Sequence, residues 1–152
     1  MKTRAAHILD SLSIRYEIRE FTEELLTAEE AAQKLNLPLE QIFKTLVVRG
    51  DRNGIMEVCV PGSRELNLKS LARLSGDKKT DLVEVDDVFR LTGYLRGGCS
   101  PLGGKREYPV FIDESALSCP MISISAGMRG MQIFIDPHDL IKATHAMVGN
   151  LT

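Results

Sequence analysis

The spacing of apolar residues at the start of the chain predicts a helix followed by a strand. Between residues 14 and 21, apolar and polar positions alternate as they do in a half-buried strand. Before that segment, four apolar side chains recur at the i, i+3, i+4, i+7 spacing of one helical face, which predicts a helix over about residues 3–12. These four are Ala5, Ile8, Leu9 and Leu12.

A capping signal predicts a second helix. Thr27 stands three residues before Glu30, so that each side chain can satisfy a free amide group of a first helical turn. We expect this helix to run to about residue 36, and Pro38 to open a further short turn.

Strands and helices alternate irregularly through the rest of the chain, which favours an α+β fold around a curved mixed sheet. A length of 152 residues suits one hydrophobic core, so we expect a single domain over residues 1–152. The expected elements are a hairpin of strands 42–48 and 55–60 around a turn at 50–54, a helix from the cap Asn67 to Gly76, a helix from Asp86 to Gly93, strands at 110–112, 121–125 and 131–135, and a final helix from the cap Asp136 to Gly149.

Composition and charge exclude several classes of protein. No apolar run approaches the roughly 20 residues of a membrane-spanning helix, and the first residues lack a signal-peptide core, so we expect a cytoplasmic protein without membrane contact. Three cysteines without C-x-x-C spacing and three scattered histidines predict reduced thiols and no metal. With 19 basic and 21 acidic residues the net charge is −2, which disfavours a protein that coats DNA or RNA but permits contact with one RNA end.

Lys44 is the first residue that suggests chemistry. By the two-residue period of a strand it shares a face with Leu46 and Val48. A lysine there either lays its stem on apolar surface while its ammonium group reaches water, or lines a cleft and holds a phosphate or a developing oxyanion. The residues alone leave both interpretations open.

The segment from Gly97 to Gly104 is the most glycine-dense of the chain. Glycines let a backbone approach a ligand closely and turn its amide groups inward, and the neighbouring Lys105 and Arg106 favour an anionic ligand. A plain connection between a helix and a strand explains the same composition. The segment is neither a P-loop nor a dinucleotide fingerprint, and Cys99 and Ser100 lack a nucleophile motif and a nearby histidine.

Six segments of the chain are distinctive when taken together: Phe43-Lys44-Thr45-Leu46-Val47, Leu66-Asn67-Leu68-Lys69, Thr92-Gly93-Tyr94, Gly97-Gly98-Cys99-Ser100-Pro101-Leu102-Gly103, Phe111-Ile112-Asp113 and Ser125-Ala126-Gly127-Met128-Arg129-Gly130. In this order and spacing they resemble the YbaK/EbsC family, and the likeness runs from about Ala5 to about Leu140. This family is related to the editing domain inserted in bacterial prolyl-tRNA synthetases and includes free-standing deacylases that clear tRNA(Pro) mischarged with cysteine or alanine.

The resemblance implies a partial barrel flanked by helices, with a cleft for the 3′ end of tRNA. Lys44 matches the family's active-site lysine, near the terminal adenosine and the ester, and Gly97 to Pro101 match its G-x-x-x-P loop. The substrate-binding residues that the resemblance implies are Phe21, Thr45, Gly97, Gly98, Ser100, Pro101, Gly103, Ser125, Gly127, Arg129 and Gln132.

Two positions depart from the family's pattern. Phe21 stands where cysteine-clearing relatives have a tyrosine, and Gln132 stands where many relatives carry an acid. Either change can alter the amino-acid preference.

The resemblance favours a deacylase that removes cysteine from tRNA(Pro), with the substrate's own thiol as the attacking group and no metal or cofactor. Its partner is the tRNA acceptor end, and a prolyl-tRNA synthetase could supplement the affinity. The alternatives are a deacylase of Ala-tRNA(Pro) or another misacylated tRNA, with water as attacker, a non-catalytic module that binds a nucleotide or tRNA end, and a generic esterase.

Overall fold

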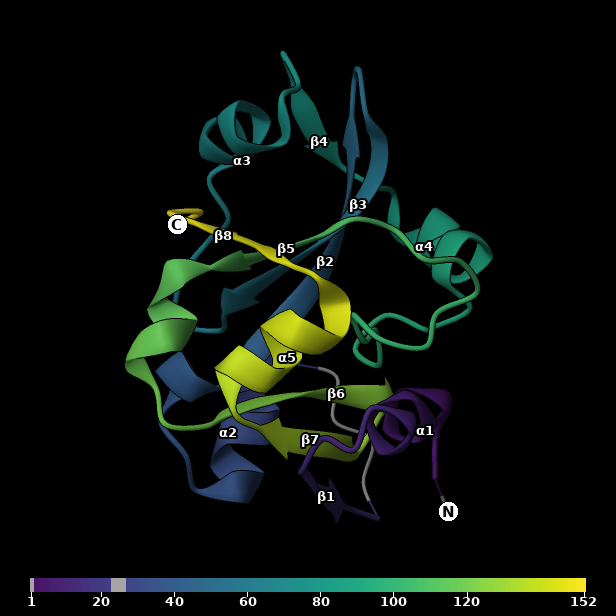
Figure 1. The fold of residues 1–152 in the computed structure, drawn as a ribbon, viewed down its shortest axis with the longest axis vertical. Coiled ribbons are helices and arrows are strands. Elements are labelled where there is room, and N and C mark those ends of the chain that lie inside the picture. The colour runs from purple at the N-terminus through teal and green to yellow at the C-terminus, as the bar shows by residue number, and fades with distance from the viewer. Residues whose placement is uncertain (1, 23–26) are drawn as a thin grey trace.

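The structure is a computed structural model, which describes residues 2–22 and 27–152. Helices and strands intermix along the chain, as the irregular pattern predicts (Figure 1). The elements are α1 (Arg4–Ser11), β1 (Glu17–Glu20), α2 (Ala28–Leu35), the 3₁₀ turn η1 (Leu39–Gln41), β2 (Phe43–Gly50), β3 (Gly54–Pro61), α3 (Leu68–Ser75), β4 (Thr80–Leu82), α4 (Val85–Thr92), β5 (Val110–Asp113), the 3₁₀ turn η2 (Glu114–Ser118), β6 (Ile122–Met128), β7 (Met131–Ile135), α5 (Pro137–Thr144) and β8 (Met147–Gly149).

The strands form two sheets. A five-stranded mixed sheet has the order β4-β2-β3-β5-β8, and a three-stranded antiparallel sheet has the order β1-β7-β6. A single parallel bridge between Ile42 and Ser123 joins them where β2 begins. The predicted α+β class and mixed sheet are confirmed, but within the residues that the structure describes the strands do not close into a full barrel.

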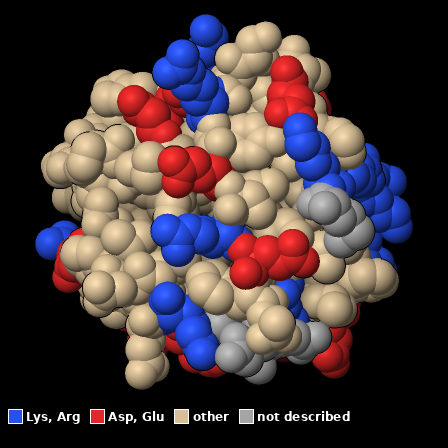
Figure 2. Space-filling model, turned by 90° about the horizontal axis from the view of Figure 1, so that it is seen from below, with Lys and Arg blue, Asp and Glu red and all other residues tan. Residues whose placement is uncertain are grey.

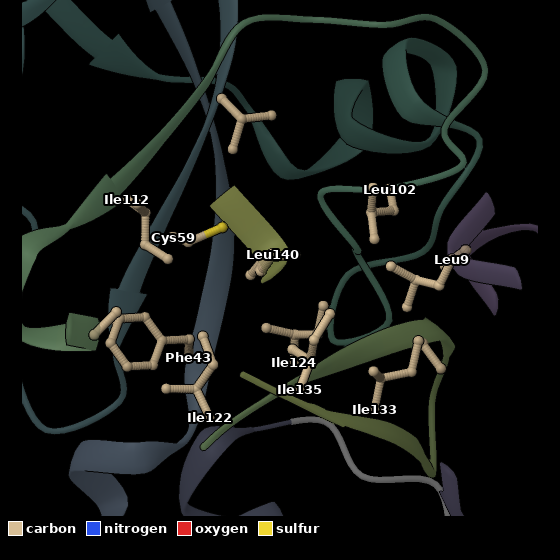
Figure 3. Packing of buried hydrophobic residues seen from close by; sticks show 14 of the residues in the cluster. Leu9, Phe43, Cys59, Leu102, Ile112, Ile122, Ile124, Ile133, Ile135 and Leu140 are labelled. Carbon is tan, nitrogen blue, oxygen red and sulfur yellow. The ribbon is translucent and has the colours of Figure 1, made fainter. Parts of the chain in front are cut away.

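The main hydrophobic core contains side chains from both sheets, and also from α1 and α5. The alternation along the β2–β3 hairpin divides its side chains between two clusters. Phe43 and Cys59 enter this main core, whereas Val48 and Val58 lie in a second cluster with Leu71 of α3. Figure 3 shows the main core, with labels on Leu9, Phe43, Cys59, Leu102, Ile112, Ile122, Ile124, Ile133, Ile135 and Leu140.

The predicted helix caps are confirmed. The side chains of Thr27, Asn67 and Asp136 each accept a hydrogen bond from a backbone N–H of the first turn of their helix. Gly76 and Gly93 end α3 and α4 in the left-handed conformation. No helix within residues 2–22 and 27–152 is long and apolar enough to cross a membrane.

Two expected elements differ from the structure, and one further strand was not expected. The first strand is shorter than residues 14–21, because a turn with Ser13 at φ 57° precedes it and only Glu17–Glu20 pair with β7. The prediction of a final helix to Gly149 is wrong: α5 ends at Thr144, and residues 147–149 form β8 beside β5. The sequence analysis also missed β4, which pairs with the end of β2.

A long-range polar contact explains the mistake at β8. The carboxylate of Asp113 accepts a hydrogen bond from the backbone N–H of Leu151 at 2.8 Å, and the carbonyl of Leu151 accepts one from the N–H of Asn67 at 2.7 Å. These bonds fix the last residues in extended form beside β5. The local apolar spacing, which suits a helix, does not reveal them.

Candidate active site

A cavity of about 410 Å³ lies along the edge of β2. This volume suits a nucleoside-sized ligand. The wall is formed by α2, β2, the β4–α4 segment, the β6–β7 sheet and the glycine-rich loop, by which we mean residues 96–104. It therefore contains residues from most of the chain. The lining residues are Thr27, Ala28, Glu29, Ala31, Ile42, Phe43, Lys44, Thr45, Leu46, Val47, Leu82, Val83, Val85, Val88, Arg96, Gly97, Cys99, Ser125 and Gln132.

The pairing of β2 explains why the cavity forms there. On one side β2 pairs with β3 along its whole length, whereas on the other side β4 pairs only with Val48–Gly50. The first half of β2 is therefore an edge within the cavity wall. Because an edge is reached from both faces of the sheet, Lys44 and Thr45 both line the cavity although their side chains alternate.

Lys44 is partly buried in this wall. It shares the strand face of Leu46 and Val48, as the sequence predicts, and its cross-strand neighbour is Val60. Among the described residues no carboxylate lies within ion-pair distance of its ammonium group. Its positive charge is therefore available to a ligand in the cavity.

The glycine-rich loop and the β6–β7 turn are packed against each other. A Cβ atom at Gly98 would lie 3.1 Å from the backbone nitrogen of Arg129, so only glycine permits this contact without a shift. The Nε of Arg129 donates a hydrogen bond to the carbonyl of Arg96 at 2.8 Å. The two segments thus form one unit at one end of the cavity.

Tyr94 contacts both the glycine-rich loop and the β6–β7 turn. Its hydroxyl donates a hydrogen bond to the carbonyl of Leu102 at 2.6 Å. Its ring packs on the turn: a Cβ atom at Gly127 would lie 2.8 Å from the Cε1 atom of Tyr94. Both loops are therefore positioned by one aromatic side chain, and burial raises its pKa to about 12, so the hydroxyl stays protonated.

The structure brings some of the predicted site residues into the cavity wall and leaves others behind it. Ser100 and Pro101 are buried, and the Ser100 hydroxyl accepts a hydrogen bond from the N–H of Leu102. Phe21 packs against the apolar cluster of α2. The predicted residues in the wall are Lys44, Thr45, Gly97, Ser125 and Gln132, and those outside it are Phe21, Gly98, Ser100, Pro101, Gly103, Gly127 and Arg129.

No sequence pattern predicts that α2 and the β4–α4 segment contribute to the cavity wall. These residues are mostly apolar or are ordinary helix-surface residues, and they carry no signal of a site until the fold brings them together. The polar lining residues at the start of α2 are Thr27 and Glu29.

The cysteines are poor candidates for a nucleophile. All three are unpaired. Burial raises the pKa of the Cys59 thiol to about 12, and it also raises the pKa of Cys99 strongly. Both thiols are thus protonated at neutral pH. No histidine is among the described residues that line the cavity, so its serine and threonine hydroxyls lack the usual activating base.

Glu57 lies behind the cavity wall as a buried carboxyl group. It is 3% exposed, and one of its oxygens, Oε2, has no hydrogen-bond partner within the described part of the chain. Burial raises its pKa from the ordinary 4.5 to about 7. Its cross-strand neighbour, Val47, lines the cavity, and its charge acts on Cys59 and Cys99. No sequence pattern indicates that Glu57 is buried next to the cavity wall.

The face of the molecule shown in Figure 2 carries basic and acidic side chains next to each other. Basic side chains gather at the right edge of this view, while acidic ones interrupt the rest of the face. This distribution agrees with a net charge of −2 and differs from a surface that covers a long stretch of nucleic acid.

The chain matches, over residues 22–143, the family model described as the aminoacyl-tRNA editing domain. It therefore belongs to the aminoacyl-tRNA editing domain family, whose members cleave the ester between an amino acid and tRNA. The resemblance seen in the sequence is confirmed, and with it the assignment of the chain as an aminoacyl-tRNA deacylase.

Several relatives agree with this assignment. The chain is 39% identical, over 99% of its length and 93% of the relative's, to an Enterococcus faecalis protein named "Putative Cys-tRNA(Pro)/Cys-tRNA(Cys) deacylase EbsC". It is 34% identical over 86 residues to the proline–tRNA ligase of Thermosipho africanus, which covers 57% of this chain and 15% of the ligase.

Two crystal structures share the fold over nearly the whole chain. One, described as a putative trans-editing enzyme for prolyl tRNA synthetase, has a TM-score of 0.86 and 28% identity and covers 100% of this chain and 98% of that one. The other, of a hypothetical protein, has a TM-score of 0.92 and 26% identity and covers 98% and 99%.

Proposed function

We propose that this protein removes cysteine that has been wrongly attached to tRNA(Pro). The observation that carries the proposal is the cavity on the edge of β2, which has a lysine in its wall and no activated protein nucleophile among its described residues. Because no protein group in this wall is activated to attack the ester, the site suits a substrate that contains its own nucleophile. The thiol of cysteine is one.

The relatives support both parts of this substrate. The Enterococcus faecalis relative is named for Cys-tRNA(Pro) and Cys-tRNA(Cys), and part of the chain is similar to a segment of proline–tRNA ligases. A tRNA acceptor end would thus be the partner, with a prolyl-tRNA synthetase as a second protein that handles the same tRNA. Charged tRNA is used in the cytoplasm, so the protein would act there.

In the proposed reaction the substrate thiol attacks its own ester carbonyl. A sulfur–carbon bond forms, the ester carbon–oxygen bond breaks, and the thiol proton passes to the ribose oxygen that leaves with the tRNA. The released thiolactone is then hydrolysed by water. The Lys44 ammonium group would stabilise the developing oxyanion or the adjacent phosphate, and the glycine-rich loop would hold the terminal nucleotide.

The direct test is a deacylation panel with wild-type protein. The substrates are tRNA(Pro) charged with cysteine, serine, alanine or proline, each labelled in the amino acid. Serine is the informative control because it replaces only the sulfur by oxygen, and a hydroxyl is a far weaker nucleophile than a thiol.

The proposal predicts rapid loss of cysteine, at least about a hundredfold faster than that of serine, and no loss of proline. Equal rates for cysteine and serine would eliminate the thiol mechanism. Rapid loss of alanine alone would instead assign the protein to Ala-tRNA(Pro), with water as attacker. Binding of uncharged tRNA without loss from any substrate would indicate a binding module.

A further inference from the structure

Glu29 is the only acidic side chain among the described residues that line the cavity. The other charged side chains of the wall are Lys44 and Arg96, both positive, and the remaining polar groups, such as the amide of Gln132, are neutral. The wall therefore offers one negative charge on α2 and two positive charges on β2 and the glycine-rich loop.

The first turn of α2 does not need the carboxylate of Glu29. Thr27 caps the helix by accepting a hydrogen bond from the N–H of Glu30 at 3.1 Å, and its hydroxyl contacts the carboxylate of Glu30 at 3.3 Å. Both contacts of the cap therefore involve Glu30 and neither involves Glu29. Among the described residues, Glu29 has neither a hydrogen bond nor an ion pair from its side chain.

Packing fixes the start of α2 against the cavity. Ala31 and Ala32 are buried in one cluster with Ile42, the residue just before β2. Ala28 and Ala31 line the cavity next to Glu29. The carboxylate is thus carried by an exposed position on a helix that packs beside the cavity.

We infer that Glu29 binds the α-ammonium group of the aminoacyl end; this rests on the proposed function. An aminoacyl ester carries a positive charge one carbon away from the ester carbonyl and a negative phosphodiester on the other side of the ribose. The wall supplies charges of the complementary signs, with a carboxylate on α2 and cations at Lys44 and Arg96. Glu29 is in this sense a specificity-determining residue.

The consequence is selection for a free amino group. Acylation of the amine removes its charge and adds bulk, as in peptidyl-tRNA or formylated initiator tRNA. A carboxylate at this point therefore lets the enzyme clear an aminoacyl-tRNA while it leaves amine-blocked species intact.

The test is a binding measurement that does not depend on turnover. The probes are 3′-deoxy-3′-(L-cysteinylamino)adenosine, in which an amide replaces the ester, and its N-acetyl derivative. Calorimetric Kd values are measured at about pH 6.5, where the amine is protonated. The proteins are wild type, Glu29→Gln and the matched control Glu30→Gln, which removes the same charge from the same helical turn but does not line the cavity.

The inference predicts that wild type and Glu30→Gln prefer the free-amine probe, and that Glu29→Gln weakens its binding by about tenfold or more without changing that of the acetylated probe. Equal weakening of both probes, no weakening of either, or a wild type that does not prefer the free amine would each overturn the inference. Failure of the proposed function is seen separately, as absent deacylation of Cys-tRNA(Pro) by the wild type.

Discussion

Glu57 shows how strongly burial can change one side chain of this protein. Its carboxyl group is 3% exposed and its pKa is raised from 4.5 to about 7 because burial disfavours the charged form. Between these two pH values the unfolded chain gives up the proton while the folded chain keeps it. The free energy of unfolding should therefore fall as the pH rises from about 4.5 to about 7. Above pH 7 Glu57 should contribute little further change.

Glu57→Gln is expected to remove this dependence, because the amide is neutral at every pH and has nearly the same shape. At pH 8 the variant should be more stable than the wild type by up to about 3 kcal/mol, whereas at about pH 4, below both pKa values, the two should be similar. Urea unfolding at both pH values measures the difference. A constant difference between the two proteins across this range would show that Glu57 ionises normally.

The site could be predicted from single residues only in part. Lys44 stands out because a cation interrupts an apolar strand face, and Gly97 stands out by local composition; both line the cavity. Ser125 and Gln132 were added by the family resemblance. Glu29 could not be found this way, because an acid in the first turn of a helix is ordinary.

At the scale of elements, local signals predicted most helix and hairpin boundaries. The caps of α2, α3 and α5 act within one turn, so a few adjacent residues suffice to indicate them. β4 and β8 depend instead on pairing with strands far away in the sequence, β2 and β5. The division into two sheets is likewise a tertiary property, and short apolar runs do not reveal it.

The contact between the β6–β7 turn and Tyr94 leads to a prediction about loop geometry. Gly127 has a φ of +102°, and a Cβ atom there would lie 2.8 Å from the Cε1 atom of Tyr94. Gly127→Ala should therefore destabilise the protein by about 1–3 kcal/mol, through backbone strain and the clash together. Gly54→Ala is the matched control, since Gly54 has a φ of +76° but no atom within 4 Å of the added Cβ.

Thermal or urea unfolding of both alanine variants separates the two effects. The control reports backbone strain alone, and the excess loss at Gly127 reports the contact with Tyr94. An equal loss of stability in the two variants would mean that Tyr94 can move away from the added methyl group without an energetic penalty and does not fix the turn.

At the scale of the whole molecule, charge limits how the protein contacts RNA. The net charge is −2, and the face in Figure 2 mixes both signs. We expect recognition of one end of the tRNA, with few phosphates neutralised.

This limit predicts a shallow salt dependence. The slope of log kcat/KM against log salt concentration should correspond to no more than about three phosphates, because each neutralised phosphate contributes a slope of about −0.7 to −0.9. Deacylation rates between about 50 and 200 mM salt measure this slope. A slope that indicates six or more phosphates would require an extended RNA-binding surface.

We propose that ester cleavage takes place in the cavity on the edge of β2, with Lys44 as its essential cation. Single-turnover deacylation of Cys-tRNA(Pro) by wild type, Lys44→Ala and the matched control Lys142→Ala, an exposed lysine of α5 outside the cavity wall, tests it most directly. The account predicts that Lys44→Ala loses about a hundredfold or more in rate with an unchanged unfolding transition, while the control behaves as wild type. A folded Lys44→Ala protein with wild-type rate would contradict it and remove the cavity from the reaction.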